Sequence, residues 1–321
     1  MNVASRSPPG LEVRSASRAP PRLAQSLRET FVARTFRVTM RYVALTKPRV
    51  MSLAVFTAYV GIVSAGMPLR MGSVVSMLIC IAGGAGSAAA LNMWYESDID
   101  RRMTRTAMRP IPAGQISRSN ALGFGLSLGL VAVITLGLIA NTVAAVLLAG
   151  TIAFYVIVYT VWLKRRTSLN IVIGGAAGAL PPVVGWAAAG GPVSLQPAIL
   201  FLVILLWTPP HFWSLAVLRR EEYARAGVPM LPVIYGIAHT KNQILVYSVL
   251  LVLTTLLPWA SGFADARYGV LAAILGAKFL MLARRLWRST TLESAAAHDL
   301  FKYSIFYLGV LFAGLLLEAA A

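Results

Sequence analysis

The sequence has few acidic residues, and its charges are strongly unbalanced. Only 11 of the 321 residues are Asp or Glu, against 29 Lys and Arg, and charged residues together make up 12% of the chain. Hydrophobic residues make up 58%, and the mean hydropathy is +0.72. This composition excludes an ordinary soluble domain, in which about a quarter of the residues are charged. We therefore expect an integral membrane protein.

Cysteine is almost absent as well. Cys80 is the only one, which excludes a disulfide framework within the chain, and we interpret it as a packing residue. The first forty residues lack the apolar core of a secretory signal. They are rich in Arg, Ser, Pro and Ala, so we expect residues 1–41 to form a basic, disordered cytoplasmic arm. Alternatives are a mitochondrial targeting peptide and a basic surface helix over 23–40.

Nine segments are apolar and long enough to cross a membrane as helices, which takes about 20 residues each. These runs are far longer than a membrane β-strand. We therefore predict an all-α polytopic membrane protein in which residues 42–321 form one intramembrane domain. The predicted spans are 43–65, 71–95, 120–139, 142–163, 169–190, 196–217, 242–262, 268–287 and 302–319.

The basic residues are sorted between the two sides of this arrangement. Of the 29 Lys and Arg, 23 fall in the N-terminal arm or in the loops that follow even-numbered spans, whereas the opposite loops hold only Arg70 and Arg267. By the positive-inside rule the N-terminus and the even loops are cytoplasmic, and nine spans put the C-terminus on the other side. Because this sorting accounts for the net charge of +18, we expect no nucleic-acid partner.

The stretch NMWYESDIDRRMTRTAMRPIPAGQIS, 92–117, places acids and arginines together at the cytoplasmic end of the second span. Asn92, Glu96 and Asp100 are spaced i, i+4 and i+8, so they share one face of a helix that continues this span, while Asp98 points elsewhere. Oxygen ligands in such a row suit Mg²⁺. Acids at the end of an apolar span mark a functional site by default, although loop acids also simply offset neighbouring arginines.

The arginines that follow fit a phosphorylated partner of such an ion. Arginine recognises phosphate oxygens in a bidentate manner, whereas a simple cation site would be repelled by several of them. Carboxylates, Mg²⁺ and basic residues together predict a diphosphate site. The candidates for binding the diphosphate are Arg101, Arg105, Arg109, Lys164 and Lys47.

A second acidic cluster, in RREEYARAGVPMLPV, lies four spans later and on the same side. Glu221 and Glu222 are candidates to complete the metal shell, and Tyr223 offers a hydroxyl. On this interpretation the metal ligands are Glu96, Asp100 and Glu222. The equal separation predicts two four-helix pseudo-repeats plus a ninth helix, with both acidic loops facing a central cavity. A solvated surface loop has the same composition.

Several polar and small residues inside the spans have more than one interpretation. The glycine- and alanine-rich runs in the second and fifth spans are either packing surfaces or space for a long apolar ligand. Pro181-Pro182 and Pro209-Pro210 are expected to bend or interrupt their helices. Asn170 and His211 are satisfied core residues, substrate contacts or, for His211, a ligand to iron.

The strings YTVWLKRRTSLNIVIGGAAGALPPVVGW, WTPPHFWSLAV and EEYARAGVPMLPVIYG, together with the first acidic stretch, resemble the protoheme IX farnesyltransferases. These form the haem O synthase branch of the UbiA-type intramembrane prenyltransferase superfamily. The resemblance runs from about Lys47 to the final span. It implies a nine-helix bundle around a cavity open to lipid, Mg²⁺ as cofactor, and farnesyl diphosphate and haem b as substrates. Haem A synthase and terminal oxidase assembly are the implied partners.

The resemblance carries over onto Asn92, Glu96 and Asp100 as the first diphosphate motif, with Glu96 where the superfamily has Asp. In the second motif many relatives have acids four apart, whereas Glu222 is followed by Ala226, so the residue that completes it is open. The resemblance implies a respiratory membrane, and we expect a bacterial inner membrane, with the mitochondrial inner membrane as the alternative.

Competing interpretations remain at this level. The same chemistry on a quinone precursor or a chlorin has the same acidic motifs. A secondary transporter also has many spans and broken helices, but its coupling ions usually bind near the midplane, and a haem-binding assembly factor would depend on His211 rather than on Asp100.

Overall fold

The structure, a computed structural model, describes residues 21–290 and 295–320. Within these ranges the secondary structure is entirely helical. The helices α1 to α8, with the π-helix η1, are Pro21–Leu45, Pro48–Ser64, Met71–Tyr95, Ser97–Arg102, Arg118–Ile139, Thr142–Ala153, η1 Phe154–Leu163, Asn170–Ala179 and Pro181–Ala188. The helices α9 to α15 are Leu195–Leu218, Arg220–Arg225, Leu231–Ile234, Gly236–Thr255, Leu257–Ala260, Ala266–Arg288 and Ala295–Ala320.

Eight helical segments of the described residues are long and apolar enough to cross a membrane. A ninth apolar helix, α2, has 17 residues, which is at the short end of what spans a bilayer. Thr142–Leu163 and Met71–Tyr95 coincide with two predicted spans. The all-helical, multi-span membrane fold expected from the sequence is therefore confirmed, with nine as an approximate count.

The first predicted span begins later than its composition suggests. The expected start was residue 43, but α1 ends at Leu45 and α2 begins at Pro48. Proline is well suited to the first turn of a helix and disfavours helical backbone in the residue before it. A new helix therefore starts at Pro48.

The chain divides into two units, residues up to Met40 and residues from Arg41 onward. In the first unit the structure describes the helical residues 21–40 of α1, where the sequence allowed either a disordered arm or a basic helix. The part of the expected arm before Pro21 lies outside the described residues.

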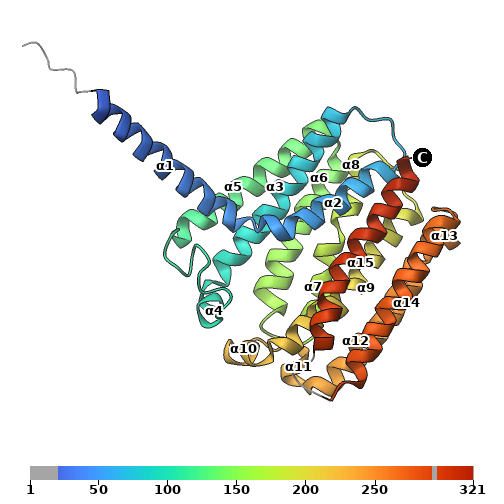
Figure 1. Cartoon of the computed structure of the whole chain (residues 1–321). Helices are drawn as coiled ribbons and strands as arrows, with labels where there is room; N and C mark the ends of the chain where they lie inside the picture. Colours follow the sequence, from blue (N-terminus) through green and yellow to red (C-terminus); the bar gives the residue numbers. More distant parts are fainter. Residues whose placement is uncertain (1–20, 291–294, 321) are drawn as a thin grey trace, which may run out of the picture. The chain divides into compact units, whose positions relative to one another are not determined.

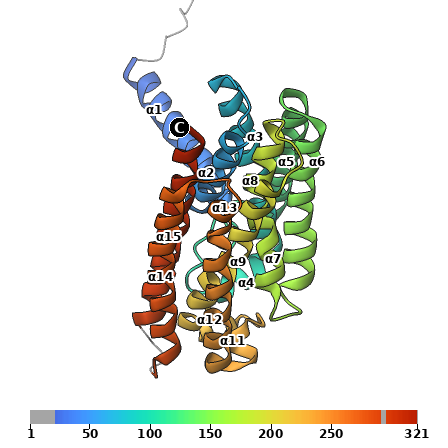
Figure 2. The same cartoon turned by 90° about the vertical axis from the view of Figure 1, so that its right-hand side faces the viewer.

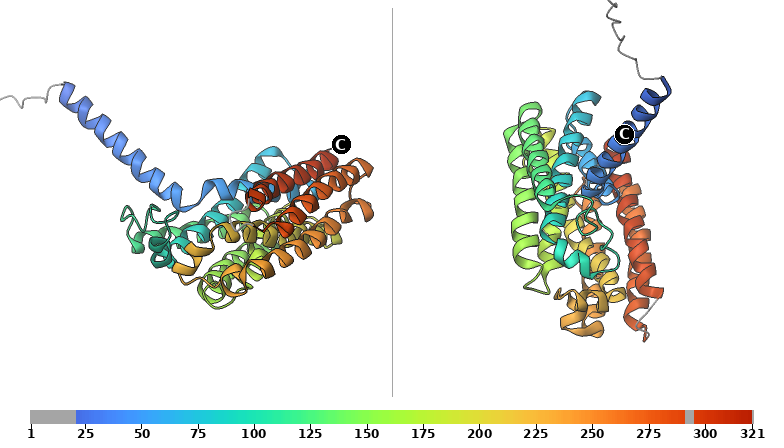
Figure 3. Two further views of the ribbon diagram at one scale, coloured as in Figure 1. Left: turned by 60° about the horizontal axis from the view of Figure 1, so that its bottom comes forward. Right: turned by 90° about the vertical axis from the view of Figure 1, so that its left-hand side faces the viewer.

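The second unit is a bundle of long helices, shown from further sides in Figures 2 and 3. Its buried apolar side chains form two large clusters. One joins α2, α3, α5, α6 and α8, and the other joins mainly α9, α12, α14 and α15. The first cluster includes α8 from the predicted fifth span, and the second includes Val60 of α2. The clusters therefore do not separate the two halves expected from the sequence, and the internal repeat stays a prediction.

Small residues allow close helix packing, as one interpretation of the sequence expected. A methyl group added at Gly61 of α2 would overlap the backbone of Pro182 in α8, and one added at Gly185 of α8 would overlap the backbone of Ala58 in α2. The α2 and α8 backbones therefore lie against one another through these two glycines.

The two proline pairs behave differently. The fifth span is interrupted at Leu180, between α7 and α8, directly before Pro181. By contrast, α9 runs without interruption through Pro209 and Pro210, so an interruption there is not found. The hydroxyl of Thr208, just before this pair, donates to the carbonyl of Ile204 at 2.8 Å.

Candidate active site

Both acidic motifs lie at the same end of the bundle, around the short helices α4 and α10 (Figures 1 and 3). In the first motif α3 ends at Tyr95 and α4 begins at Ser97, so Glu96 lies between two helices. Hydrogen bonds from Glu96 N to Asn92 O, 3.0 Å, and from Asp100 N to Glu96 O, 2.9 Å, keep the i, i+4 register through this junction. The predicted common face is retained.

All three motif residues are buried. Asn92 and Glu96 are each 2% exposed and Asp100 is 3% exposed. Asp98, which the spacing placed on another face, is exposed and pairs with Arg165 through two hydrogen bonds of 2.8 and 3.0 Å. Burial desolvates the Asp98 carboxylate, but the bonds from Arg165 outweigh this and lower its pKa.

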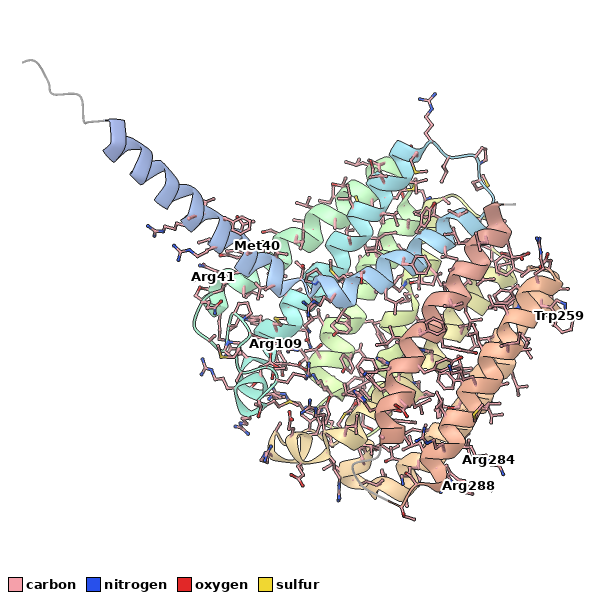
Figure 4. The ribbon with its side chains drawn as sticks, in the orientation of Figure 1. Met40, Arg41, Arg109, Trp259, Arg284 and Arg288 are labelled. Atoms are coloured by element: carbon pink, nitrogen blue, oxygen red, sulfur yellow. The ribbon has the colours of Figure 1, made fainter. Side chains whose placement is uncertain are left out.

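Each buried motif residue has its own basic partner. Lys47 Nζ donates to Asn92 Oδ1 at 2.8 Å, and Lys164 Nζ donates to Glu96 Oε2 at 2.6 Å. A single nitrogen of Arg109 donates to both carboxylate oxygens of Asp100, at 2.8 and 2.9 Å. Figure 4 labels Arg109. Three of the five predicted diphosphate-binding residues therefore contact the motif.

The other two predicted residues do not join this network. Arg101 and Arg105 are exposed, and within the described ranges neither forms an ion pair. Arg101 follows Asp100 directly within α4, so its side chain points to another face of that helix, and Arg105 lies beyond the end of α4 at Arg102.

Lys47 has an unusual backbone. It lies in the turn between α1 and α2 with φ of 52°, the one positive φ of a non-glycine residue among those described. Such a conformation costs about 1–3 kcal/mol and is found at functional sites. Burial, and then the charge of Arg109, lower the pKa of Lys47 to about 7. The charges of Glu96, Asp100 and Lys164 also act on it, so these groups form one electrostatic cluster.

Lys164 completes the cluster from the end of η1. Burial lowers the pKa of Lys164, but its pairing with Glu96 outweighs burial and holds the pKa above the ordinary value. Its ammonium group also lies 5.9 Å from the centre of the Tyr159 ring. Lys164 is therefore charged at neutral pH.

The second motif meets this cluster through one residue. Tyr223 of α10 lies near enough to Lys164 to contribute to its raised pKa. Glu222 accepts a hydrogen bond from Arg219 at 2.7 Å, while Glu221 is exposed. Tyr223 of the second motif is therefore linked electrostatically to Lys164, the partner of Glu96 in the first motif.

Sequence reasoning missed Thr160 of η1. Thr160 is fully buried, and the amide nitrogen of Asn92 donates to its hydroxyl oxygen at 3.1 Å. The only signal was a hydroxyl within the otherwise apolar run of the fourth span, which by itself predicts nothing about Asn92.

Asn170 and His211 are both buried, and each has a polar contact within the protein. Asn170 donates to the carbonyl of Thr167 at 2.7 Å. The His211 ring stacks between Trp207 and Phe301, with ring centres 4.3 and 4.7 Å away, and its Nδ1 lies 2.7 Å from Ser304 Oγ. These contacts match the core interpretation of His211, and its role in binding haem stays a prediction.

The donor set of the two motifs contains carboxylates that fit a divalent cation. Within the ranges described, no three His, Cys, Asp or Glu side chains gather closely enough to hold a metal. However, Glu96 Oε1 and Glu222 Oε2 are buried without any hydrogen-bond partner. An unpartnered buried carboxylate oxygen is costly unless it is liganded, so the chemistry of these residues fits a hard cation such as Mg²⁺.

Comparison with known proteins identifies the family. The UbiA prenyltransferase family matches residues 54–306. A protoheme IX farnesyltransferase from Rhodopseudomonas palustris is 55% identical over 282 residues, which are 87% of this chain and 90% of that protein.

Solved structures share the fold. A digeranylgeranylglyceryl phosphate synthase superposes with a TM-score of 0.73 at 19% identity, over 88% of this chain and 99% of that one. A UbiA homologue from Archaeoglobus fulgidus bound to DMAPP and Mg²⁺ gives a TM-score of 0.68 at 17% identity, with the same coverage. The chain belongs to the UbiA prenyltransferase family.

Proposed function

We propose that this enzyme transfers the farnesyl group of farnesyl diphosphate to a vinyl group of protoheme IX, haem b, and so forms haem O. The observation that carries the proposal is the buried network in which Asn92, Glu96 and Asp100 each contact a base, Lys47, Lys164 and Arg109 respectively. The relative named protoheme IX farnesyltransferase supports the choice of substrates.

The bases of this network would bind the diphosphate. Lys164 and Arg109 pair with Glu96 and Asp100, and diphosphate oxygens would compete for the same donors. Positive groups that are already desolvated and oriented stabilise the charge that develops on the leaving diphosphate. Tyr223, beside Lys164, would add a hydroxyl donor from the second motif.

Glu96, Asp100 and Glu222 would hold Mg²⁺, in agreement with the unpartnered oxygens on Glu96 and Glu222. When bound, Mg²⁺ neutralises diphosphate charge and polarises its oxygens as a Lewis acid. The solved relative that carries DMAPP and Mg²⁺ supports this cofactor.

The overall reaction needs no covalent enzyme intermediate. The allylic C–O bond of farnesyl diphosphate breaks, a C–C bond forms to the terminal vinyl carbon of the haem, and water adds to the adjacent carbon with loss of a proton. The products are haem O and diphosphate. The face of Tyr159, which already lies 5.9 Å from the Lys164 ammonium group, is suited to stabilise the allylic cation by a cation–π interaction.

Incubation of membranes with haem b and farnesyl diphosphate tests the proposal. We expect extracted haem whose mass has increased by one farnesyl group and one hydroxyl group, formed with Mg²⁺ and not in excess chelator. A product on a quinone precursor or a chlorin, with haem left unchanged, would contradict the choice of acceptor but not prenyl transfer.

We also propose a bacterial inner membrane as the location, with the N-terminus in the cytoplasm and the C-terminus in the periplasm. The loop arginines that support this orientation include Arg284 and Arg288 at the end of α14, far from Trp259 near its start (Figure 4). Haem A synthase and terminal oxidase assembly are the proposed users of the product.

A further inference from the structure

The segment that carries Lys164 is a π-helix. Residues Phe154–Leu163 form η1, which continues α6 without a loop, and Lys164 N donates to Tyr159 O, an i→i+5 bond, at 2.9 Å. The π-helix is rare, and it appears mostly as single-turn bulges inside α-helices, which occur frequently at functional sites. The run contains no glycine or proline that would explain a local change of helix type.

The π register decides which residues share a face. In an α-helix of 3.6 residues per turn, residues nine apart, such as Tyr155 and Lys164, lie on opposite sides. In an i→i+5 helix the turn is longer, so these two residues are about two turns apart and lie on the same side. The Tyr155 ring lies 5.3 Å from the Tyr159 ring, and the centre of the Tyr159 ring lies 5.9 Å from the Lys164 ammonium group.

Thr160 of the same helix also contacts the motif. Thr160 is five residues from Tyr155, hence one turn of this helix, and its hydroxyl accepts the hydrogen bond from Asn92. Asn92 can then present only its Oδ1 to the other side, where Lys47 donates to it. The chain of contacts from Thr160 through Asn92 fixes the ammonium group of Lys47.

A glycine holds the register in place. A methyl group on Gly174 of α7 would overlap the ring of Tyr159, whereas one on Gly178 in the same helix would meet nothing within 4 Å. The Tyr159 ring therefore lies directly on the α7 backbone and fixes the rotation of η1.

We infer that the π-helical register of η1 positions the diphosphate site, with Thr160 as a positioning residue that orients Asn92 and, through it, Lys47. The inference rests on the proposed function, because it assumes that Lys47 and Lys164 bind the diphosphate. The inference adds Thr160 to the site. In this scheme Thr160 contacts neither the carboxylates that would bind the metal nor the substrate.

The first test removes the hydroxyl alone. In Thr160→Val we expect the dissociation constant for farnesyl diphosphate, titrated with Mg²⁺ into the purified full chain, to rise at least tenfold. The KM for haem should stay within twofold of the unchanged protein. Thr160→Ser should restore binding to within twofold. The matched control is Thr151→Val, since the Thr151 hydroxyl bonds only within α6, to Leu147 O at 2.7 Å.

The second test displaces the helix without touching any polar group. Gly174→Ala should weaken farnesyl diphosphate binding at least fivefold, while Gly178→Ala should leave it unchanged. These two variants keep the inference testable if Thr160→Val fails to fold.

The outcomes distinguish the positioning role of η1 and Thr160 from the proposed function. If the unchanged protein binds farnesyl diphosphate and Thr160→Val or Gly174→Ala binds it equally well, the positioning role is overturned and the proposed function stands. If Thr160→Val raises the KM for haem as much as it weakens diphosphate binding, the effect is general and the inference also fails. If the unchanged protein does not bind farnesyl diphosphate at all, both proposals fail together.

Discussion

At the scale of single residues, burial separates two aspartates that are neighbours in sequence. Asp100 is 3% exposed and holds Arg109 through both oxygens, whereas the Asp98 side chain is 49% exposed. An exposed ion pair such as Asp98–Arg165 contributes only about 0–1 kcal/mol. We therefore predict that Asp100→Ala lowers haem O formation at least a hundredfold and that Asp98→Ala lowers it less than threefold. Comparable turnover in the two variants, at equal amounts of folded protein, would contradict the site.

A second prediction separates stability from activity. Glu96 is buried and Lys164 is partly buried. Removing Lys164 would leave a buried charge on Glu96, which typically costs roughly 3–5 kcal/mol. We expect Lys164→Met to lower the unfolding temperature in detergent. Adding Glu96→Gln to this variant should recover most of the lost unfolding temperature. Haem O formation should stay lost in the double variant. Restored activity would show that the pair serves only the fold.

The sequence predicted this site only as far as chemistry and helical spacing reach. Asn92, Glu96 and Asp100 were recognisable because acids are rare here and share an i, i+4 spacing. The contacts of Lys47 and Lys164 were not determined by spacing, since Lys47 depends on a left-handed turn before Pro48 and both partners come from other helices. Thr160 was missed because its hydroxyl, in an apolar run that also contains Tyr155 and Tyr159, has no distinctive pattern.

At the scale of elements, packing of α2 on α8 depends on backbone contact. A side chain at Gly61 would overlap the Pro182 carbonyl, so the two helices would have to separate. Overpacking of this kind costs typically 1–3 kcal/mol. We predict that Gly61→Ala lowers the unfolding temperature by several degrees.

The control for that variant is Gly72→Ala in α3. An added methyl group there meets nothing within 4 Å, and replacing glycine in a helix is neutral or stabilises by about 0.4–1 kcal/mol. Equal destabilisation by both substitutions would show that the effect comes from the backbone change itself and not from the α2–α8 contact.

Hydropathy predicts where helices lie but not what kind of helix they are. Lipid requires every backbone group to be satisfied within the span, so a long apolar run must be helical, and Thr142–Leu163 was predicted to the residue. An α-helix and a π-helix satisfy the same groups with the same composition. The change of register at Phe154 therefore follows from tertiary contacts such as that of Tyr159 with Gly174.

At the scale of the whole molecule, the distribution of Lys and Arg among the loops predicts the orientation of the protein in the membrane. Loop arginines fall on the side of both acidic motifs, which lie together around α4 and α10 (Figure 1). The positive-inside rule places that side in the cytoplasm. Diphosphate substrates of cytoplasmic origin would then reach the site directly, whereas the opposite orientation would require them to cross the membrane.

Cysteine labelling decides between these orientations. With Cys80 replaced by Ser, we predict that Met67→Cys, in the exposed loop between α2 and α3, reacts with a membrane-impermeant maleimide in cells whose outer membrane alone is opened. Gln115→Cys, in the exposed loop between α4 and α5, should react only after the inner membrane is permeabilised. Position 67 precedes α3 and position 115 follows it, so the two positions lie on opposite sides of the membrane. The reverse labelling pattern would therefore invert the whole topology and place the site in the periplasm.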